Sequence, residues 1–197
     1  MISPARFQFI HRNISRHISL TKSEAEYFRS ILTHRTVRRR HFLVEAGEPC
    51  RHEHYVLKGC LRSFIMDRDG FEHVLQFAIE DWWTSDLSSL LTGAPATQTI
   101  EALEDTEVLM LERHAYDELC ERVPAFNKLF RILLQNAYVA HERRILGIIG
   151  QTAEERYEDF ITRYPALVQR IPQKHIAAYL GITPEFLSRI RGKRARG

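Results

Sequence analysis

The residues with the clearest chemical pattern lie near the carboxyl end, where basic and small polar side chains follow two short helical repeats. Residues 171–191 read IPQKHIAAYLGITPEFLSRIR. Pro172 suits the first turn of one helix, and Gly181 allows a sharp turn after it. Thr183 followed by Pro184 is an N-cap with proline at the first helical position, which starts a second helix. Apolar residues at helical spacing can bury one shared face: Ile176, Ala177, Leu180, Ile182, Leu187 and Ile190. This layout is typical of a helix-turn-helix that binds DNA.

The charge of the same segment favours a polyanionic partner. Residues 170–197 contain seven lysines and arginines and one acidic residue, Glu185. The whole chain has 28 basic and 25 acidic residues, so residues 1–169 hold 21 and 24 and are net negative. This asymmetry is expected of a sensor joined to a nucleic-acid-binding domain.

His52 and His54 are candidates for a different chemistry, metal binding. Alternate residues of a strand point to the same side, so the two histidines could share a metal ion. His52 follows Gly47 by four intervening residues, which is close to the Gly-x5-His-x-His motif of cupin metalloenzymes. The cupin pattern also needs a glutamate three or four residues later, where this sequence has Leu57, Lys58 and Gly59, and no second half-motif follows. A cupin-like metalloenzyme therefore stays an alternative, and we expect a protein without metal, cofactor or enzymatic activity.

Composition limits where the chain acts. Hydrophobic residues make up 44% and charged residues 27%, and no apolar run reaches the roughly eighteen residues of a membrane span. The three cysteines, Cys50, Cys60 and Cys120, lack the spacing of a disulfide framework or of a zinc or iron-sulfur site. We expect a protein of the reducing cytoplasm that does not enter a membrane.

Short strands separated by turns dominate from about residue 36 to residue 112. The strand-like runs are 56–57, 61–66, 74–77, 99–102 and 108–111, and Asp69-Gly70 predicts a hairpin. Several strands with no long helix between them imply an antiparallel sandwich or roll. Before the roll, Thr21 and Glu24 form a capping box that starts a helix.

A long amphipathic helix is predicted over residues 124–149. Its length of about 26 residues corresponds to roughly 39 Å, more than a small roll needs for cover. Part of its apolar stripe is therefore expected to meet a second copy, with His141 packed or paired there. Gly150 breaks the helix as a hinge, and Thr152 with Glu155 caps the next one. The predicted dimer interface comprises Phe126, Phe130, Leu133, Leu134, Ala137, His141, Ile145 and Ile148.

Over nearly its full length the sequence resembles the Crp/Fnr superfamily of bacterial transcription regulators. The most specific segments are AAYLGITPEFLSRIR, FLVEAGEPCRHEHYVLKGCLRSFI and EALEDTEVLMLER. The resemblance implies an α+β protein: an N-terminal helix and jelly roll of the cyclic-nucleotide-binding type (1–123), a dimerisation helix (124–150) and a helix-turn-helix domain (151–197). Family members continue into a β-hairpin wing. This sequence stops at Gly197 after GKRARG, so either the wing is missing or the sequence is shortened, and we expect the basic tail to contact phosphates.

The resemblance also implies roles in DNA binding. The recognition helix should run from Pro184 to about Arg191, with Glu185, Ser188 and Arg189 at base-reading positions. Arginine can bond guanine bidentately and glutamate can accept from a cytosine amino group. Expected phosphate anchors are Lys174, Thr183, Arg191 and Lys193. A homodimer would read an inverted repeat in double-stranded DNA with half-sites roughly 34 Å apart, and RNA polymerase is a further partner that the resemblance admits.

The effector pocket implied by the resemblance has lost its usual chemistry. Members that bind a cyclic nucleotide carry Gly-Glu before a short helix and Arg-Ser or Arg-Thr after it. Here Ser85-Asp86 and Ala96-Thr97 stand in those places, so a phosphate would be buried without its arginine. Iron-sulfur members carry N-terminal cysteines, and residues 1–49 have none. We expect no response to cyclic AMP and leave the effector unknown; a true cyclic-nucleotide receptor is the nearer alternative. The degenerate pocket comprises Ser85, Asp86, Leu87, Ala96 and Thr97.

Overall fold

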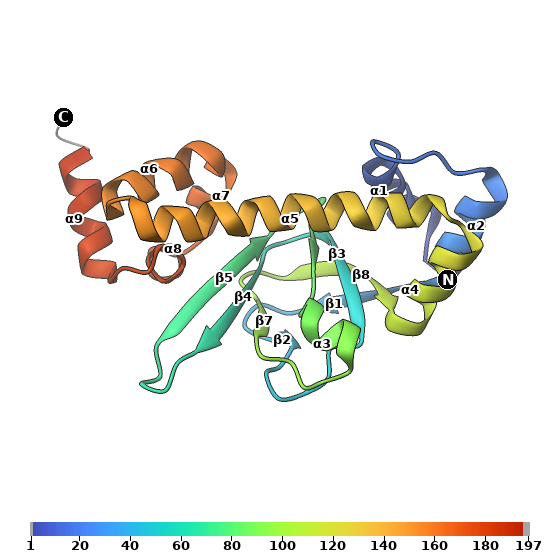
Figure 1. The fold of residues 1–197 in the computed structure, drawn as a ribbon, viewed down its shortest axis with the longest axis horizontal. Coiled ribbons are helices and arrows are strands. Elements are labelled where there is room, and N and C mark those ends of the chain that lie inside the picture. Colours follow the sequence, from blue (N-terminus) through green and yellow to red (C-terminus); the bar gives the residue numbers. More distant parts are fainter. Residues whose placement is uncertain (1, 195–197) are drawn as a thin grey trace. The chain divides into compact units, whose positions relative to one another are not determined.

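The computed structural model describes residues 2–194, which fall into two compact units (Figure 1). The first unit comprises residues 1–63 and 77–135, and the second comprises residues 64–76 and 136–197. This division crosses a β-hairpin and a long helix, whereas the sequence leads us to expect segments 1–123, 124–150 and 151–197. The boundaries of those three segments stay a prediction.

Two four-stranded sheets form the roll that the sequence predicts. The strands are β1 (Leu32–Val37), β2 (Phe42–Val44), β3 (His52–Lys58), β4 (Leu61–Met66), β5 (Glu72–Ala78), β6 (Trp83–Thr84), β7 (Thr99–Ala102) and β8 (Thr106–Glu112). One sheet has the order β1-β8-β3-β6 and the other β2-β7-β4-β5. The pairs β1–β8, β3–β8, β3–β6 and β2–β7 are antiparallel, which confirms the roll. The strand pattern of the sequence did not indicate β1, β2 or β6.

Helices of the first unit cover the roll and share its core. They are α1 (Pro4–Ile14), α2 (Lys22–Ile31), α3 (Leu87–Thr92), α4 (Arg113–Arg122) and the first part of α5 (Ala125–Gly150). Phe28 of α2 packs on Phe126 of α5 with ring centroids 4.6 Å apart, and both side chains are fully buried. A separate apolar cluster fills the roll itself, with Val56, Ile100 and Val108 at 0% exposure. Burial of these side chains is the main stabilising contribution to this unit.

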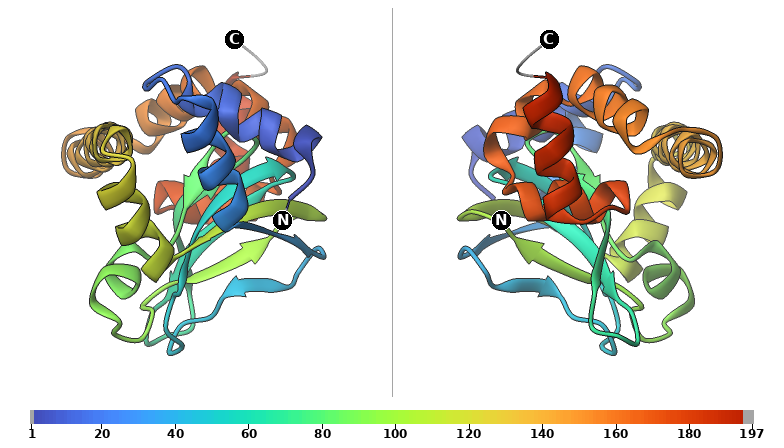
Figure 2. Two further views of the ribbon diagram at one scale, coloured as in Figure 1. Left: turned by 90° about the vertical axis from the view of Figure 1, so that its right-hand side faces the viewer. Right: turned by 90° about the vertical axis from the view of Figure 1, so that its left-hand side faces the viewer.

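The second unit contains the rest of α5 and a group of shorter helices. These are α6 (Ala153–Arg163), α7 (Pro165–Arg170), α8 (Gln173–Leu180) and α9 (Pro184–Arg194). The right-hand view of Figure 2 looks onto α9, coloured red, which lies at the front of this unit. The sequence pattern did not indicate α7, and Pro172 is the N-cap of α8 instead of a first-turn residue. In the described part of the chain, no helix combines the length and apolar character needed to cross a membrane.

Both predicted capping boxes are present. In the first, Thr21 N–H donates to Glu24 Oε2 at 2.7 Å, and Glu24 N–H donates to Thr21 Oγ1 at 3.3 Å. In the second, the corresponding distances between Thr152 and Glu155 are 2.8 and 3.2 Å. Each box satisfies N–H groups that have no partner within the helix, so the starts of α2 and α6 are fixed locally by sequence.

Candidate nucleic-acid interface and effector cassette

The turn between α8 and α9 is built from the residues that the sequence singled out. Gly181 ends α8 in the left-handed conformation, with φ 68° and ψ 38°. The next residue, Ile182, donates its N–H to Ala177 O at 3.1 Å and so satisfies a carbonyl of the last turn of α8. Thr183 Oγ1 accepts from Phe186 N–H at 3.2 Å, which caps the start of α9. The helix-turn-helix therefore has a defined stop and a defined start.

The two helices share one buried face, as the apolar spacing predicts. Five of the six expected residues are at most 4% exposed: Ile176, Ala177, Leu180, Leu187 and Ile190. Ile182, in the turn, is half-buried. Since Leu187 and Ile190 lie on one side of α9, the opposite side of that helix faces solvent.

All seven candidate DNA-binding residues are exposed. Five lie on α9, Thr183 is its N-cap, and Lys174 is in the first turn of α8; the set is Lys174, Thr183, Glu185, Ser188, Arg189, Arg191 and Lys193. The Arg189 guanidinium lies 5.0 Å from the Phe186 ring centroid. Within residues 2–194 it forms no ion pair, as is also true of Lys174 and Arg191. These three cations are therefore available to an external anion.

Acidic residues of α6 face the last turn of α9. Lys193 Nζ lies 3.7 Å from Glu154 Oε1, and Arg194 Nε lies 2.9 Å from Glu158 Oε1. All four side chains are at least 45% exposed, so the pairs are screened by water and contribute little to stability. The sequence predicts Lys193 as a phosphate anchor but does not indicate that Glu154 lies beside it.

The residues of the predicted degenerate pocket, called the effector cassette from here on, lie together around α3. Ser85 and Asp86 precede this helix, Leu87 begins it, and Ala96 and Thr97 follow it. Asp86 is 1% exposed. Ser85 Oγ donates to Glu53 Oε2 of β3 at 2.6 Å, and burial raises the pKa of Glu53 to about 7. Sequence reasoning did not include Glu53 in the cassette, because β3 is distant in the chain.

Asp86 is held by main-chain donors on both sides of the cassette. Its Oδ1 accepts from Ser89 N–H at 3.0 Å. Its Oδ2 accepts from the N–H groups of Thr97 and Gln98 at 2.8 and 3.2 Å, and from Thr97 Oγ1 at 3.3 Å. Burial acts to raise the pKa of Asp86, but these hydrogen bonds lower it below its ordinary value of 3.8. The carboxylate therefore occupies the donors that an anionic ligand would need.

The two histidines considered as metal ligands, His52 and His54, lie on β3 with one residue between them. The His52 and His54 ring centroids are 6.1 Å apart. His54 is 2% exposed, its Nδ1 lies 3.1 Å from Thr84 O, and burial lowers its pKa to about 3. Within the described residues, His, Cys, Asp and Glu do not form a group of three or more that could hold a metal ion. The geometry therefore offers a pair of histidines without a third protein ligand.

The predicted dimer stripe on α5 is only partly exposed. Phe126 is fully buried in the core of the first unit, and Phe130 and Leu133 pack against the same core. Phe126 is therefore unavailable to a second copy, because the protomer itself covers this end of the helix. Further along, Leu134, Ala137, His141, Ile145 and Ile148 are exposed.

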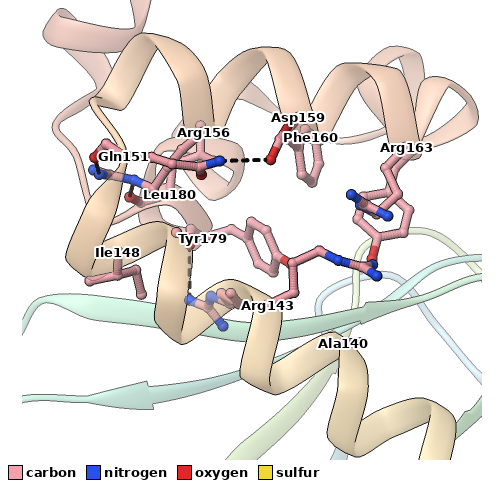
Figure 3. Close-up of a pocket in the computed structure, with 13 residues that line it drawn as sticks. Ala140, Arg143, Ile148, Gln151, Arg156, Asp159, Phe160, Arg163, Tyr179 and Leu180 are labelled. Atoms are coloured by element: carbon pink, nitrogen blue, oxygen red, sulfur yellow. Dashed lines mark hydrogen bonds between the residues drawn. The ribbon is translucent and has the colours of Figure 1, made fainter.

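Arginines surround a hollow of about 60 Å³ in the second unit (Figure 3). It lies among α5, α6 and α8, and its lining includes Arg143, Arg144, Arg156, Arg163 and Tyr179. Arg156 Nη1 donates to Gln151 O at 2.8 Å, and Arg156 Nε to Leu180 O at 3.2 Å. The roles of Arg144 and Arg156 were not predicted from the sequence, because their partners are carbonyl groups that carry no residue-type signature.

Comparisons with known proteins agree with this architecture. Residues 34–123 match the family described as cyclic nucleotide-binding domain. The fumarate and nitrate reduction regulatory protein of Vibrio cholerae is 23% identical over 192 residues, covering 89% of this chain and 74% of that protein. The transcriptional activator protein anr of Pseudomonas aeruginosa is 24% identical over 187 residues, covering 88% and 75%.

Solved structures show the same fold. FixK2 from Bradyrhizobium japonicum matches with a TM-score of 0.73 and 22% identity, over 83% of this chain and 84% of that one. A regulator of the crp/fnr family from Eubacterium rectale matches with a TM-score of 0.72 and 18% identity, over 90% and 85%. The chain is therefore similar to transcription regulators of the Crp/Fnr type, in sequence over most of its length and in fold.

Replacing Asp86 with asparagine should destabilise the protein in a pH-dependent way. An amide nitrogen cannot accept, so at least one N–H among Ser89, Thr97 and Gln98 loses its acceptor, at a cost of about 2 kcal/mol at neutral pH. The folded state lowers the pKa of Asp86, so the stabilisation by its carboxylate is complete above 3.8 and is lost as the pH falls toward the folded value.

Urea unfolding of wild type and Asp86→Asn between about pH 7 and about pH 3, a range that extends below the ordinary carboxyl pKa, measures this difference. Asp69→Asn is the control, because Asp69 is exposed in a turn. A loss for Asp86→Asn that matches the control, or that does not shrink at low pH, would contradict the assignment.

Proposed function

We propose that the protein is a homodimeric regulator that binds an inverted repeat in DNA through α9 and does not respond to cyclic AMP. The observation that carries the DNA-binding part is the exposed outer face of α9, where cationic and polar side chains surround a capped helix start. The relatives' names as transcription regulators support the same conclusion. A cytoplasmic location and contact with RNA polymerase belong to this proposal.

Arg189 is proposed to read a base. It lies on the outer side of α9 without an ion-pair partner, and its contact with the Phe186 ring restricts the guanidinium without consuming its donors. Glu185 and Ser188 are exposed on the same helix and complete the proposed base-reading set. An arginine fork matches the two acceptors of guanine in the major groove, so Arg189 is the residue with the most specific chemistry.

Phosphate binding is proposed for the residues around this centre. Lys174 and Thr183 lie at the starts of α8 and α9, where free N–H groups also favour an anion. Arg191 and Lys193 lie toward the end of α9, and Lys193 would exchange Glu154 for a phosphate. Contacts of this kind contribute affinity that depends on salt but little on sequence.

A second copy of the chain is proposed to cover the exposed stripe of α5. Leu134, Tyr138, Ile145 and Ile148 are 52–66% exposed. Together with the exposed His141 they follow the three- and four-residue spacing of a two-helix seam. Such a continuous apolar stripe on one helix is typical of an interaction surface. His141 lies on the same seam; burial, and after it the positive charge of Arg144, lowers its pKa, so a neutral ring suits the interface. Phe126, Phe130 and Leu133 are left out of this revised interface.

The lack of response to cyclic AMP is proposed from Asp86. A phosphate entering the cassette would meet a buried carboxylate that already occupies the N–H groups of Thr97 and Gln98. Repulsion between two anions in a poorly solvated site costs several kcal/mol. The residue that replaces the usual arginine, Ala96, is buried and has no charge to offset this cost.

Arg189→Ala and Lys174→Ala should weaken DNA binding in different ways. Loss of a base contact should cost about 1 to 3 kcal/mol and relax the preference at one position, whereas loss of a phosphate contact should weaken all sequences alike. Selection of bound fragments from genomic DNA supplies the operator, and titration by fluorescence anisotropy on single-base variants gives the affinities. Equal losses on operator and random DNA for both variants would refute the assignment of Arg189.

Ile145→Glu should disrupt the dimer without unfolding the protomer, because Ile145 is 57% exposed in the single chain. Two carboxylates buried across a twofold seam should raise the dimer dissociation constant by about 100-fold. Sedimentation equilibrium measures the change, and Asn136→Glu, exposed on the opposite side of α5, is the control. Unchanged association of Ile145→Glu would exclude this seam.

Calorimetric titration with cyclic AMP should give no saturable heat at micromolar ligand. The reason is the Asp86 carboxylate, which repels the ligand phosphate and competes for the same donors. Saturable micromolar binding would instead favour the alternative function, a cyclic-nucleotide receptor of the same fold.

A further inference from the structure

Arg144, on α5, is a partly buried cation held by three main-chain carbonyl groups. Its Nη1 donates to Leu75 O at 2.7 Å, and its Nη2 donates to Val74 O at 2.7 Å and to Tyr179 O at 2.9 Å. The guanidinium carbon also lies 4.3 Å from the centroid of the Tyr179 ring. Val74 and Leu75 belong to β5, and Tyr179 to the last turn of α8. One side chain therefore joins three elements of the second unit.

The charge of Arg144 is not paired with an acidic side chain in the part of the chain that the structure describes. Among residues 2–194 no carboxylate forms an ion pair with it, and its Nε is buried without an acceptor. A guanidinium removed from water is tolerated when other groups replace its hydration. The three carbonyl groups do so, and they come from two elements that must both be in place. These hydrogen bonds therefore couple the position of the Arg144 side chain to both the β4–β5 hairpin and α8.

Two further contacts act on the same elements. His175 Nδ1 of α8 lies 4.0 Å from Glu72 Oε2 of β5. Arg156 of α6 donates to Leu180 O, the carbonyl next to the one that Arg144 binds. The two final carbonyls of α8, directly before the Gly181 turn, thus each accept from an arginine; Figure 3 shows Arg156 and Tyr179 at this point. The turn of the helix-turn-helix is therefore held by arginine side chains of α5 and α6, in addition to the caps formed by its own residues.

We propose that Arg144 is a positioning residue that fastens the β4–β5 hairpin and α5 to the turn of the helix-turn-helix, and so holds α9 in one orientation relative to α5. This inference rests on the proposed DNA-binding dimer. Two recognition helices must reach two half-sites at a fixed spacing, so freedom of α8 and α9 relative to the dimer helix costs affinity for the full repeat. A single half-site imposes no such spacing. Loss of Arg144 should therefore lower the affinity for the full inverted repeat more than the affinity for a single half-site.

Hydrogen exchange on the free protein tests the fastening without DNA. Arg144→Met keeps the length of the aliphatic stem and removes all three hydrogen bonds. Exchange at residues 72–76 and in the last turn of α8 should accelerate by about tenfold or more, as expected for loss of charged hydrogen bonds. Arg143→Met is the matched control, because Arg143 is the exposed neighbour and lacks a hydrogen-bond or ion-pair partner among the described residues. Exchange in the control should match wild type.

Binding to two DNA probes tests the consequence. With Arg144→Met, the ratio of affinities for the full inverted repeat and for an isolated half-site should fall by about tenfold, while Arg143→Met leaves the ratio unchanged. Arg144→Lys is the second variant if methionine prevents folding. It keeps the charge, but an ammonium lacks the planar fork that reaches three carbonyls, so its ratio should fall as well.

Unchanged exchange in both Arg144 variants overturns the fastening, whether or not DNA is bound. Faster exchange with an equal or higher affinity ratio overturns the positioning role. Absence of DNA binding by wild type and Arg143→Met alike would instead refute the proposed function, and the exchange result would still decide whether Arg144 fastens the hairpin to α8.

Discussion

A charge removed from water needs compensating hydrogen bonds, and for Asp86 and Arg144 of this protein main-chain groups supply them. Asp86 is 1% exposed and receives N–H groups from Ser89, Thr97 and Gln98. Arg144 donates to the carbonyls of Val74, Leu75 and Tyr179. Among the described residues neither side chain has an ion-pair partner. Because backbone groups cannot move independently of their elements, each charge fixes the segments around it.

The two charges act on different parts of the chain. Asp86 joins the start of α3 to the segment that follows the helix. Its carboxylate therefore holds the two ends of the cassette together through hydrogen bonds. Arg144 joins α5 to the hairpin and to α8. The helix α5 itself changes character along its length, since Phe126 and Leu129 are fully buried in the first unit, whereas Ile145 and Ile149 are exposed. One helix therefore contributes to a core, to a proposed dimer seam and to the support of α9, the proposed recognition helix.

Local features of this structure could be predicted from sequence, and contacts between distant segments could not. The capping boxes at Thr21 and Thr152 and the stop at Gly181 depend on neighbouring residues, and the structure has all three. The roll was predicted, but β2 is three residues long and gave no periodic pattern. Phe126 fitted the apolar stripe of α5 equally well as a core residue or a dimer contact, because periodicity does not say which partner covers a face.

The same distinction explains the cassette and Arg144. The family resemblance implied that the arginine of a cyclic-nucleotide site is replaced, but it gave no hydrogen-bond partners for Asp86. The structure gives that charge a structural role, since Thr97 and Gln98 turn their N–H groups to it. A ligand that acts through this cassette would have to displace a tethered carboxylate, which remains at high effective concentration when it is released. Neutral or cationic groups avoid the repulsion that an anion would meet there. An effector of the proposed regulator is therefore best sought among ligands that leave Asp86 in place, or at a site outside α3.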